Sequence, residues 1–145
     1  MKDEVFELHA DSFPPLLQEI PDKPKKLFAR GTLPNFDKYK LLCVVGRRKF
    51  SDYGKHVCQK LIEGLSGYPI IVVSGLALGI DGIAHESAIK NNLLTIAVPG
   101  SGLSDGVIYP ASHRALAKKI LENNGCLISE FEADKKATPY MFPQR

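Results

Sequence analysis

The sequence lacks the features that would set it apart from ordinary soluble globular proteins. No apolar stretch approaches the ~18 residues that a membrane-spanning helix requires, and the first residues lack the basic segment of a signal peptide. The 145-residue chain has three cysteines, an odd number with no CxxC pair, so no disulfide framework is indicated. These absences favour a protein of the reducing cytoplasm.

Several nucleotide-binding and catalytic signatures are also missing. The chain has no GxGxxG turn followed by an acidic residue, which disfavours a dinucleotide site, and no GxxxxGK[ST] loop, which disfavours an ATPase. It has no GxSxG elbow of a serine hydrolase. The formal net charge of +3 permits a polyanionic partner without requiring one.

What is present is an alternation of strands and helices from residue 41 onward. Apolar runs predict four strands, at residues 41–45, 69–73, 93–98 and 126–129. Helical patterns lie between them, over residues 52–65, from the turn at 74–81 to about 92, and over 112–123. Val57, Leu61 and Leu65 give the first helix an apolar stripe. Strands that alternate with helices form a parallel sheet with right-handed connections, so the predicted fold class is α/β.

Residues 1–40 differ in character from the rest of the chain. Prolines punctuate this segment and leave room only for short helical turns such as residues 16–20. We predict an irregular N-terminal arm over residues 1–40 that packs on a main domain over residues 41–145. Because the chain stops soon after the fourth strand, we expect that domain to be incomplete.

Three glycine-containing turns follow strands and therefore gather along one edge of a parallel sheet. In the first, Gly46–Gly54 (GRRKFSDYG), Arg48 can clamp a phosphate, and a cap at Ser51 leaves the first-turn amides facing the same space. An exposed basic turn is the alternative. The second turn (SGLALGID) includes Ser74, Gly75 and Gly79. It is either an amide-lined anion site or a tight turn that needs small residues.

Other polar residues near this edge favour structural roles. Asp81 and His85 are four residues apart and could form a general base or half of a metal site. No further ligand cluster supports a metal, so a structural pair is favoured, with Asp81 as a helix cap. Glu130 ends the fourth strand and is a brace or an acid. Tyr109 and the following proline turn the chain into the third helix.

Five motifs, taken in order, closely resemble the DNA-processing protein A (DprA/Smf) family of bacterial transformation. The family pattern is a G-S/T-R turn with S-x-x-G, then SGxAxGID…AH, then TIAV-x-G-x-G-L…YP, then SE and FPxRN. This chain has GRRKFSDYG, SGLALGIDGIAH, TIAVPGSGLSDGVIYP, SE and FPQR. The resemblance covers about residues 13–145. Arg47 stands where the family has Ser or Thr, and Leu78 where it commonly has Arg.

The resemblance implies an extended Rossmann-like, three-layer fold that binds single-stranded DNA, dimerises and loads RecA in DNA uptake and recombination. By position, Arg48 matches the arginine of the first motif, and Phe142 and Arg145 match FPxRN. A guanidinium group holds a phosphate, and a ring stacks on a base without reading sequence. With those three residues, the expected DNA-binding residues are Ser51, Ser74, Gly75, Gly79, Gly100 and Gly102. Structural roles at the site fall to Gly46, Asp81, His85, Tyr109 and Glu130.

The expected function is therefore a cytoplasmic, non-catalytic DNA-binding protein with no catalytic residue, cofactor or metal. Its expected partners are single-stranded DNA, RecA and a second copy of the full-length protein. The rival hypothesis is a nucleotide-binding or phosphoribohydrolase-type enzyme of the same superfamily. Such enzymes carry a PGGxGTxxE motif, and here Pro99–Gly102 lacks the Thr and Glu. A fragment with no binding of its own is a third possibility.

Overall fold

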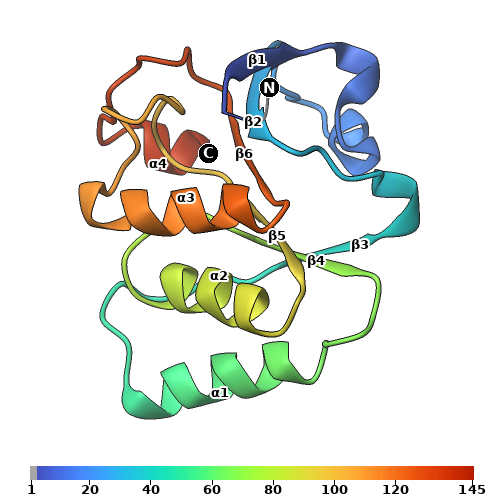
Figure 1. Ribbon diagram of the computed structural model, residues 1–145. Coiled ribbons are helices and arrows are strands. Elements are labelled where there is room, and N and C mark those ends of the chain that lie inside the picture. The colour runs from blue at the N-terminus through green and yellow to red at the C-terminus, as the bar shows by residue number, and fades with distance from the viewer. Residues whose placement is uncertain (1–2) are drawn as a thin grey trace.

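The computed structural model describes residues 3–145 as a six-stranded sheet with helices stacked along one face (Figure 1). The strands are β1 (Val5–Leu8), β2 (Leu27–Gly31), β3 (Lys40–Cys43), β4 (Ile70–Ser74), β5 (Leu94–Ala97) and β6 (Cys126–Ser129). Their order in the sheet is β1-β2-β6-β5-β4-β3. The four strands from β3 to β6 are parallel, at the predicted positions, and the α/β Rossmann-like fold class is confirmed.

The N-terminal arm differs from the prediction of an irregular segment. It supplies β1 and β2, which pair antiparallel with each other, and β2 pairs antiparallel with β6. Glu7 interrupts β1 and Arg30 interrupts β2, so neither strand gives the continuous apolar run by which the other four strands were predicted. The rest of the arm includes three short 3-10 helices, at Ala10–Ser12, Pro15–Glu19 and Phe36–Lys38. Residues 1 and 2 of the predicted arm lie outside the described residues.

Three helices lie side by side on one face of the sheet: α1 (Asp52–Glu63), α2 (Ile80–Lys90) and α3 (Arg114–Glu122). Each parallel strand is added on the same side of the preceding one, and right-handed crossovers then place every connecting helix on the same face. The arm covers part of the opposite face, where Phe13, Leu17 and Phe36 pack against Ile71 and Ile96. The three layers are therefore helices, sheet and arm.

Helix α1 buries a different face from the one predicted. The residues it buries are Cys58 and Ile62, which join a cluster with Ile83 and Ala84 of α2. Leu61, from the predicted stripe, is 67% exposed. Because α1 packs chiefly against α2, the face that it buries is rotated by one residue from the predicted stripe.

All three long helices begin at the carboxyl edge of the parallel strands, on the left in Figure 1, and the short helix α4 (Met141–Gln144) lies at the same edge. The carboxyl edge therefore collects the turns that follow β3, β4 and β5, as the parallel topology predicts.

None of the helices in the described part of the chain is both long enough and apolar enough to span a membrane.

Candidate functional site: the carboxyl edge of the sheet

The centre of the candidate site is the ring of Phe142 on α4. The preceding residue, Met141, is fully buried and anchors the helix. The ring rests directly on Gly100, where a Cβ atom would lie 2.6 Å from two of its carbons. Tyr109 packs beside it with ring centroids 5.3 Å apart at an interplanar angle of 59°. A glycine floor and a tilted neighbour thus fix the ring while leaving it partly accessible.

Two guanidinium groups flank the same ring. The Cζ atom of Arg48 lies 5.8 Å from the Phe142 centroid and that of Arg145 lies 5.5 Å away, within the range of cation–π contacts. Both arginines are exposed, and Arg145 donates from Nη1 to the Gly75 carbonyl at 2.9 Å. Burial lowers the pKa of Arg145; Asp81 raises it and Arg48 lowers it further. A slot of about 20 Å³ lies among these side chains.

Neighbouring residues fix the backbone of the first turn, Gly46–Gly54. Ser51 accepts a hydrogen bond from the Gly54 amide and so fixes the start of α1. Gly79 has a φ of 85°, and a Cβ atom there would overlap the carbonyls of Arg47 and Arg48. The Ile80 amide also donates to the Arg47 carbonyl at 3.2 Å. The second turn therefore supports the backbone of the first and leaves the arginine side chains in solvent.

The second turn is enclosed, and its polar groups are already engaged. The Gly75 amide donates to Asp81 Oδ2 at 3.1 Å, and its carbonyl accepts from Arg145. The Leu76 amide donates to His85 Nε2 at 3.3 Å, and its carbonyl accepts from His113 Nδ1 at 2.7 Å. Two amides expected to line an anion site thus donate within the protein. The second turn therefore has the geometry of a tight turn, which was the alternative to an anion site. The proposed DNA-binding role of Gly75 stays a prediction.

The two histidines have defined roles in this enclosure. His85 accepts at Nε2, so its proton is on Nδ1 and faces the Thr95 hydroxyl at 2.7 Å. That hydroxyl donates to the Val72 carbonyl. Burial, with a smaller contribution from His113, lowers the pKa of His85 to about 3. His85 is therefore neutral at physiological pH and holds Leu76 at a φ of 62°, an uncommon value for a residue with a side chain.

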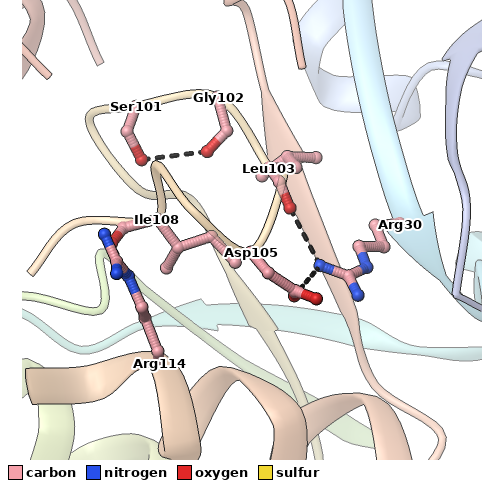
Figure 2. Close-up of polar contacts among 7 residues, drawn as sticks. All are labelled: Arg30, Ser101, Gly102, Leu103, Asp105, Ile108 and Arg114. Atoms are coloured by element: carbon pink, nitrogen blue, oxygen red, sulfur yellow. Dashed lines mark hydrogen bonds and ion pairs between the residues drawn. The ribbon is translucent and has the colours of Figure 1, made fainter. Parts of the chain in front are cut away.

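The third turn, the loop after β5 that carries Gly100, Gly102 and Tyr109, is held from two sides by arginines (Figure 2). Arg30 of β2 donates from Nη1 to the Leu103 carbonyl at 3.0 Å and to Asp105 Oδ1 at 2.6 Å. The Arg30 contact lowers the pKa of Asp105. Arg114 of α3 donates to the carbonyls of Ile108 and Gly106. The loop that carries Gly100 and Tyr109 is therefore fixed by both the arm and α3.

The structure brings together five of the residues singled out in the sequence: Arg48, Gly100, Tyr109, Phe142 and Arg145. The others lie around this group. Ser74 donates to the Val44 carbonyl at 2.6 Å, Gly46 packs against Ile80, and Gly102 packs against the carbonyls of residues 132 and 133. Their proposed roles stay predictions.

Asp81 and Glu130 are the two carboxylates that the sequence placed at the site. Asp81 was expected to cap α2, but Gly79 is at the cap position and no side chain bonds there. Asp81 instead bonds the turn before the helix, so its role as a cap is wrong. Glu130 accepts from Gln144 Nε2 at 3.3 Å, as a brace between β6 and α4 would. Among residues 3–145, no group of three His, Cys, Asp or Glu side chains is placed to hold a metal ion.

Three residues important for the site were missed in the sequence. Leu76 gave no signal, because a leucine in the left-handed region is unusual. His113 comes from the unit after β5, so its contact with the second turn depends on the tertiary fold. Arg30 sits in the arm among apolar residues, and that position was its only signal.

Comparison with known families gives a match over nearly the whole chain. The sequence profile of the family described as DNA recombination-mediator protein A matches residues 4–145. Protein Smf of Escherichia coli is 41% identical over 138 residues, which are 94% of this chain and 36% of that protein. DNA processing protein DprA of Streptococcus pneumoniae is 37% identical over 140 residues, 97% of this chain and 48% of that protein.

Solved structures give the same relationship. The chain matches the X-ray structure of DprA from Streptococcus pneumoniae with a TM-score of 0.83 at 34% identity, over 99% of this chain and 49% of that one. It matches DprA from Helicobacter pylori, in a structure described as showing a unique single-stranded DNA binding mode, with a TM-score of 0.83 at 29% identity. That match covers 98% of this chain and 63% of the other. The chain therefore spans between about a third and two thirds of these relatives.

Proposed function

We propose that this chain, which belongs to the family of DNA recombination-mediator protein A, binds single-stranded DNA at the carboxyl edge of its sheet. One base stacks on Phe142, and the adjacent phosphate pairs with Arg48. A base–aromatic contact of this kind tolerates any sequence, because every base has a π-face. A guanidinium beside it supplies affinity that depends on salt, because phosphate contacts release counterions.

The observation that carries this proposal is the packing around Phe142. Gly100 and Tyr109 fix the ring, and Arg48 and Arg145 both lie within cation–π distance of it and line the small slot. A partly accessible ring beside two cations suits an anionic ligand with an aromatic group. In support, the similar protein from Helicobacter pylori is described as binding single-stranded DNA.

The wider role follows as part of the same proposal. The family's description and the names of the relatives support action in DNA processing, and we extend this to natural transformation and to loading of RecA as a recombination mediator. We further propose that the full-length protein is a homodimer. The three cysteines of this chain are free, which suits a cytoplasmic protein.

We propose that the site is not catalytic. Asp81 and His85 bond to the turn between β4 and α2 instead of to each other, and His85 is neutral with both ring nitrogens engaged. Turnover of a nucleotide monophosphate by the pure protein, lost on Glu130→Gln, would contradict this and favour the phosphoribohydrolase-type alternative.

Fluorescence anisotropy with labelled oligo-dT at two salt concentrations tests the proposal most directly. We expect the protein to bind oligo-dT, and this binding should weaken as the salt concentration rises. A mixed-sequence duplex should compete poorly with oligo-dT. Phe142→Ala should weaken binding while leaving the salt dependence unchanged, because stacking releases no counterions. Equal competition by the duplex, or a salt dependence near zero, would rule the proposal out.

A further inference from the structure

The two flanks of the Phe142 site differ in charge. On the β3 side, the turn before α1 presents Arg47, Arg48 and Lys49, all exposed, with no acidic residue between β3 and Asp52. None of the three forms an ion pair with the residues that the structure describes. The positive potential therefore extends from Phe142 toward the start of α1.

On the β6 side, the segment between β6 and α4 is acidic on balance. Three carboxylates, at Glu130, Glu132 and Asp134, outnumber the two ammonium groups at Lys135 and Lys136. A polyanion that leaves the Phe142 site in this direction meets net negative charge. The charge of the two flanks thus favours one direction for a bound strand.

The basic flank also holds two exposed aromatic residues, Phe50 and, with the larger exposed fraction, Tyr53. Tyr53, in the first turn of α1, is 78% exposed, and the described residues supply no ring contact to it. The Ser51–Gly54 hydrogen bond fixes the helix start that carries this tyrosine. Only four residues separate it from Arg48, so the two side chains lie within one short stretch of the surface.

We propose that a single strand stacked on Phe142 continues over Arg48 and Lys49 to a second base-stacking site at Tyr53. This inference rests on the proposed function and adds a direction and a second aromatic contact to it. The cations between the two rings hold the intervening phosphates, an arrangement of interleaved aromatic and basic groups that binds single strands without reading sequence. Lys49 then contributes to the salt dependence, and Tyr53 contributes only stacking.

Three exposed tyrosines that form no ring contact with Phe142 allow a matched experiment. Tyr53 lies on the basic flank, Tyr140 on the acidic flank at 63% exposure, and Tyr68 at 63% exposure just before β4, at the opposite edge of the sheet. Affinity for 20-nucleotide oligo-dT is measured for the Tyr→Ala variant at each position and for Tyr53→Phe. Photo-crosslinking with an oligonucleotide that carries 5-iododeoxyuridine then identifies the contacted tyrosine by mass spectrometry.

We expect Tyr53→Ala to weaken binding about tenfold with an unchanged salt dependence, a loss typical of one stacked base. Tyr53→Phe should bind like the parent because it keeps the ring. Tyr68→Ala and Tyr140→Ala should also bind like the parent, and the crosslink should fall on Tyr53.

Three results would overturn the proposal. Parent-like binding by Tyr53→Ala would leave the Phe142 site standing alone, without the second contact. A loss confined to Tyr140→Ala would show that the strand leaves over the other flank. A parent protein that does not bind oligo-dT at all would overturn the proposed function together with this inference. Far-ultraviolet circular dichroism of each variant separates loss of binding from loss of folding.

Discussion

The two turns beside Phe142 have opposite designs, although both follow parallel strands. The turn after β3 keeps its arginine and lysine side chains in solvent, without ion-pair partners among residues 3–145. The turn after β4 is enclosed, and each amide and carbonyl of Gly75 and Leu76 bonds to a side chain. The first is suited to meet a ligand, and the second is suited to hold the first in place.

This difference teaches that a glycine-rich turn at a sheet edge does not by itself make an anion site. Gly75 and Gly79 are needed here because other parts of the protein approach them closely. Asp81 and Arg145 occupy the space where Gly75 would have a Cβ atom, and the Arg47 and Arg48 carbonyls occupy that space at Gly79. Substitutions in the enclosed turn should therefore affect folding, and substitutions in the open turn should affect binding alone.

The largest expected effect is that of Gly79→Ala on stability. The substitution places a side chain at a φ of 85° and against two backbone carbonyls, which cannot move as a side chain can. We expect a loss of about 3 kcal/mol in the free energy of unfolding, measured by urea denaturation. Gly106→Ala is the matched control, because nothing lies within 4 Å of its Cβ position. Equal stability of the two variants would show that the enclosed turn is not rigid.

The next effect is that of Arg48→Ala on binding. Loss of a charge-assisted phosphate contact should weaken oligo-dT binding by about 2 kcal/mol and reduce the salt dependence by roughly one contact. The melting temperature should change little, since the side chain is exposed. Parent-like affinity of Arg48→Ala would place the phosphate contact elsewhere.

A third effect is a loss of stability below neutral pH that depends on His85. Its pKa is about 3 in the folded protein and 6.5 in the unfolded chain, so the unfolded state binds more protons between these values. Stability is fully present above pH 6.5 and falls as the pH drops toward 3, by up to ~1.4 kcal/mol per pH unit. Urea denaturation at pH 7.5, 6 and 5 measures this slope.

His85→Gln should be less stable at pH 7.5, with a flatter slope between pH 5 and 6.5, because glutamine does not titrate. His56→Gln, on the exposed surface of α1, is the control and should keep the slope of the parent. If His85→Gln retained the full slope, the enclosed turn would not depend on a neutral histidine.

The smallest effect should be that of Arg47→Ala. Its backbone carbonyl, rather than its guanidinium, contacts the second turn, and no ring contact is formed by its side chain in the described structure. We expect a change in oligo-dT affinity of less than ~0.5 kcal/mol, within the usual range for a surface substitution. A larger loss for Arg47→Ala than for Arg48→Ala would reverse the assignment of the two arginines.

The part of the fold that was predicted correctly is the part with long periodic patterns. The strands and helices between residues 40 and 129 alternate clearly, and parallel topology then requires their turns to share an edge. The strands β1 and β2 could not be predicted, because polar residues interrupt both and β2 joins the sheet through β6, which is distant in the sequence. The sequence motifs assigned Arg48, Phe142 and Arg145 to one site, and the structure places these three side chains together.

The enclosure of the second turn could not be predicted from the sequence, for a different reason. The sequence shows that Ser74, Gly75 and Gly79 suit a tight turn, but not which side chains will contact that turn. The partners of Leu76 come from two separate elements, since His85 belongs to α2 and His113 precedes α3. Only the packing of those helices decides whether the amides face solvent or protein.

The antiparallel pairing of β2 with β6 has a consequence for the order of folding. Each parallel pair joins strands that follow one another in the chain, whereas Phe28 pairs with Ser129, near the other end. Closing so long a loop carries the greatest entropic cost and slows the step that requires it. We expect the β3–β6 unit to collapse first and the arm to dock last. Pulsed hydrogen exchange would then show amides of Leu27–Gly31 protected after those of Ile70–Ser74.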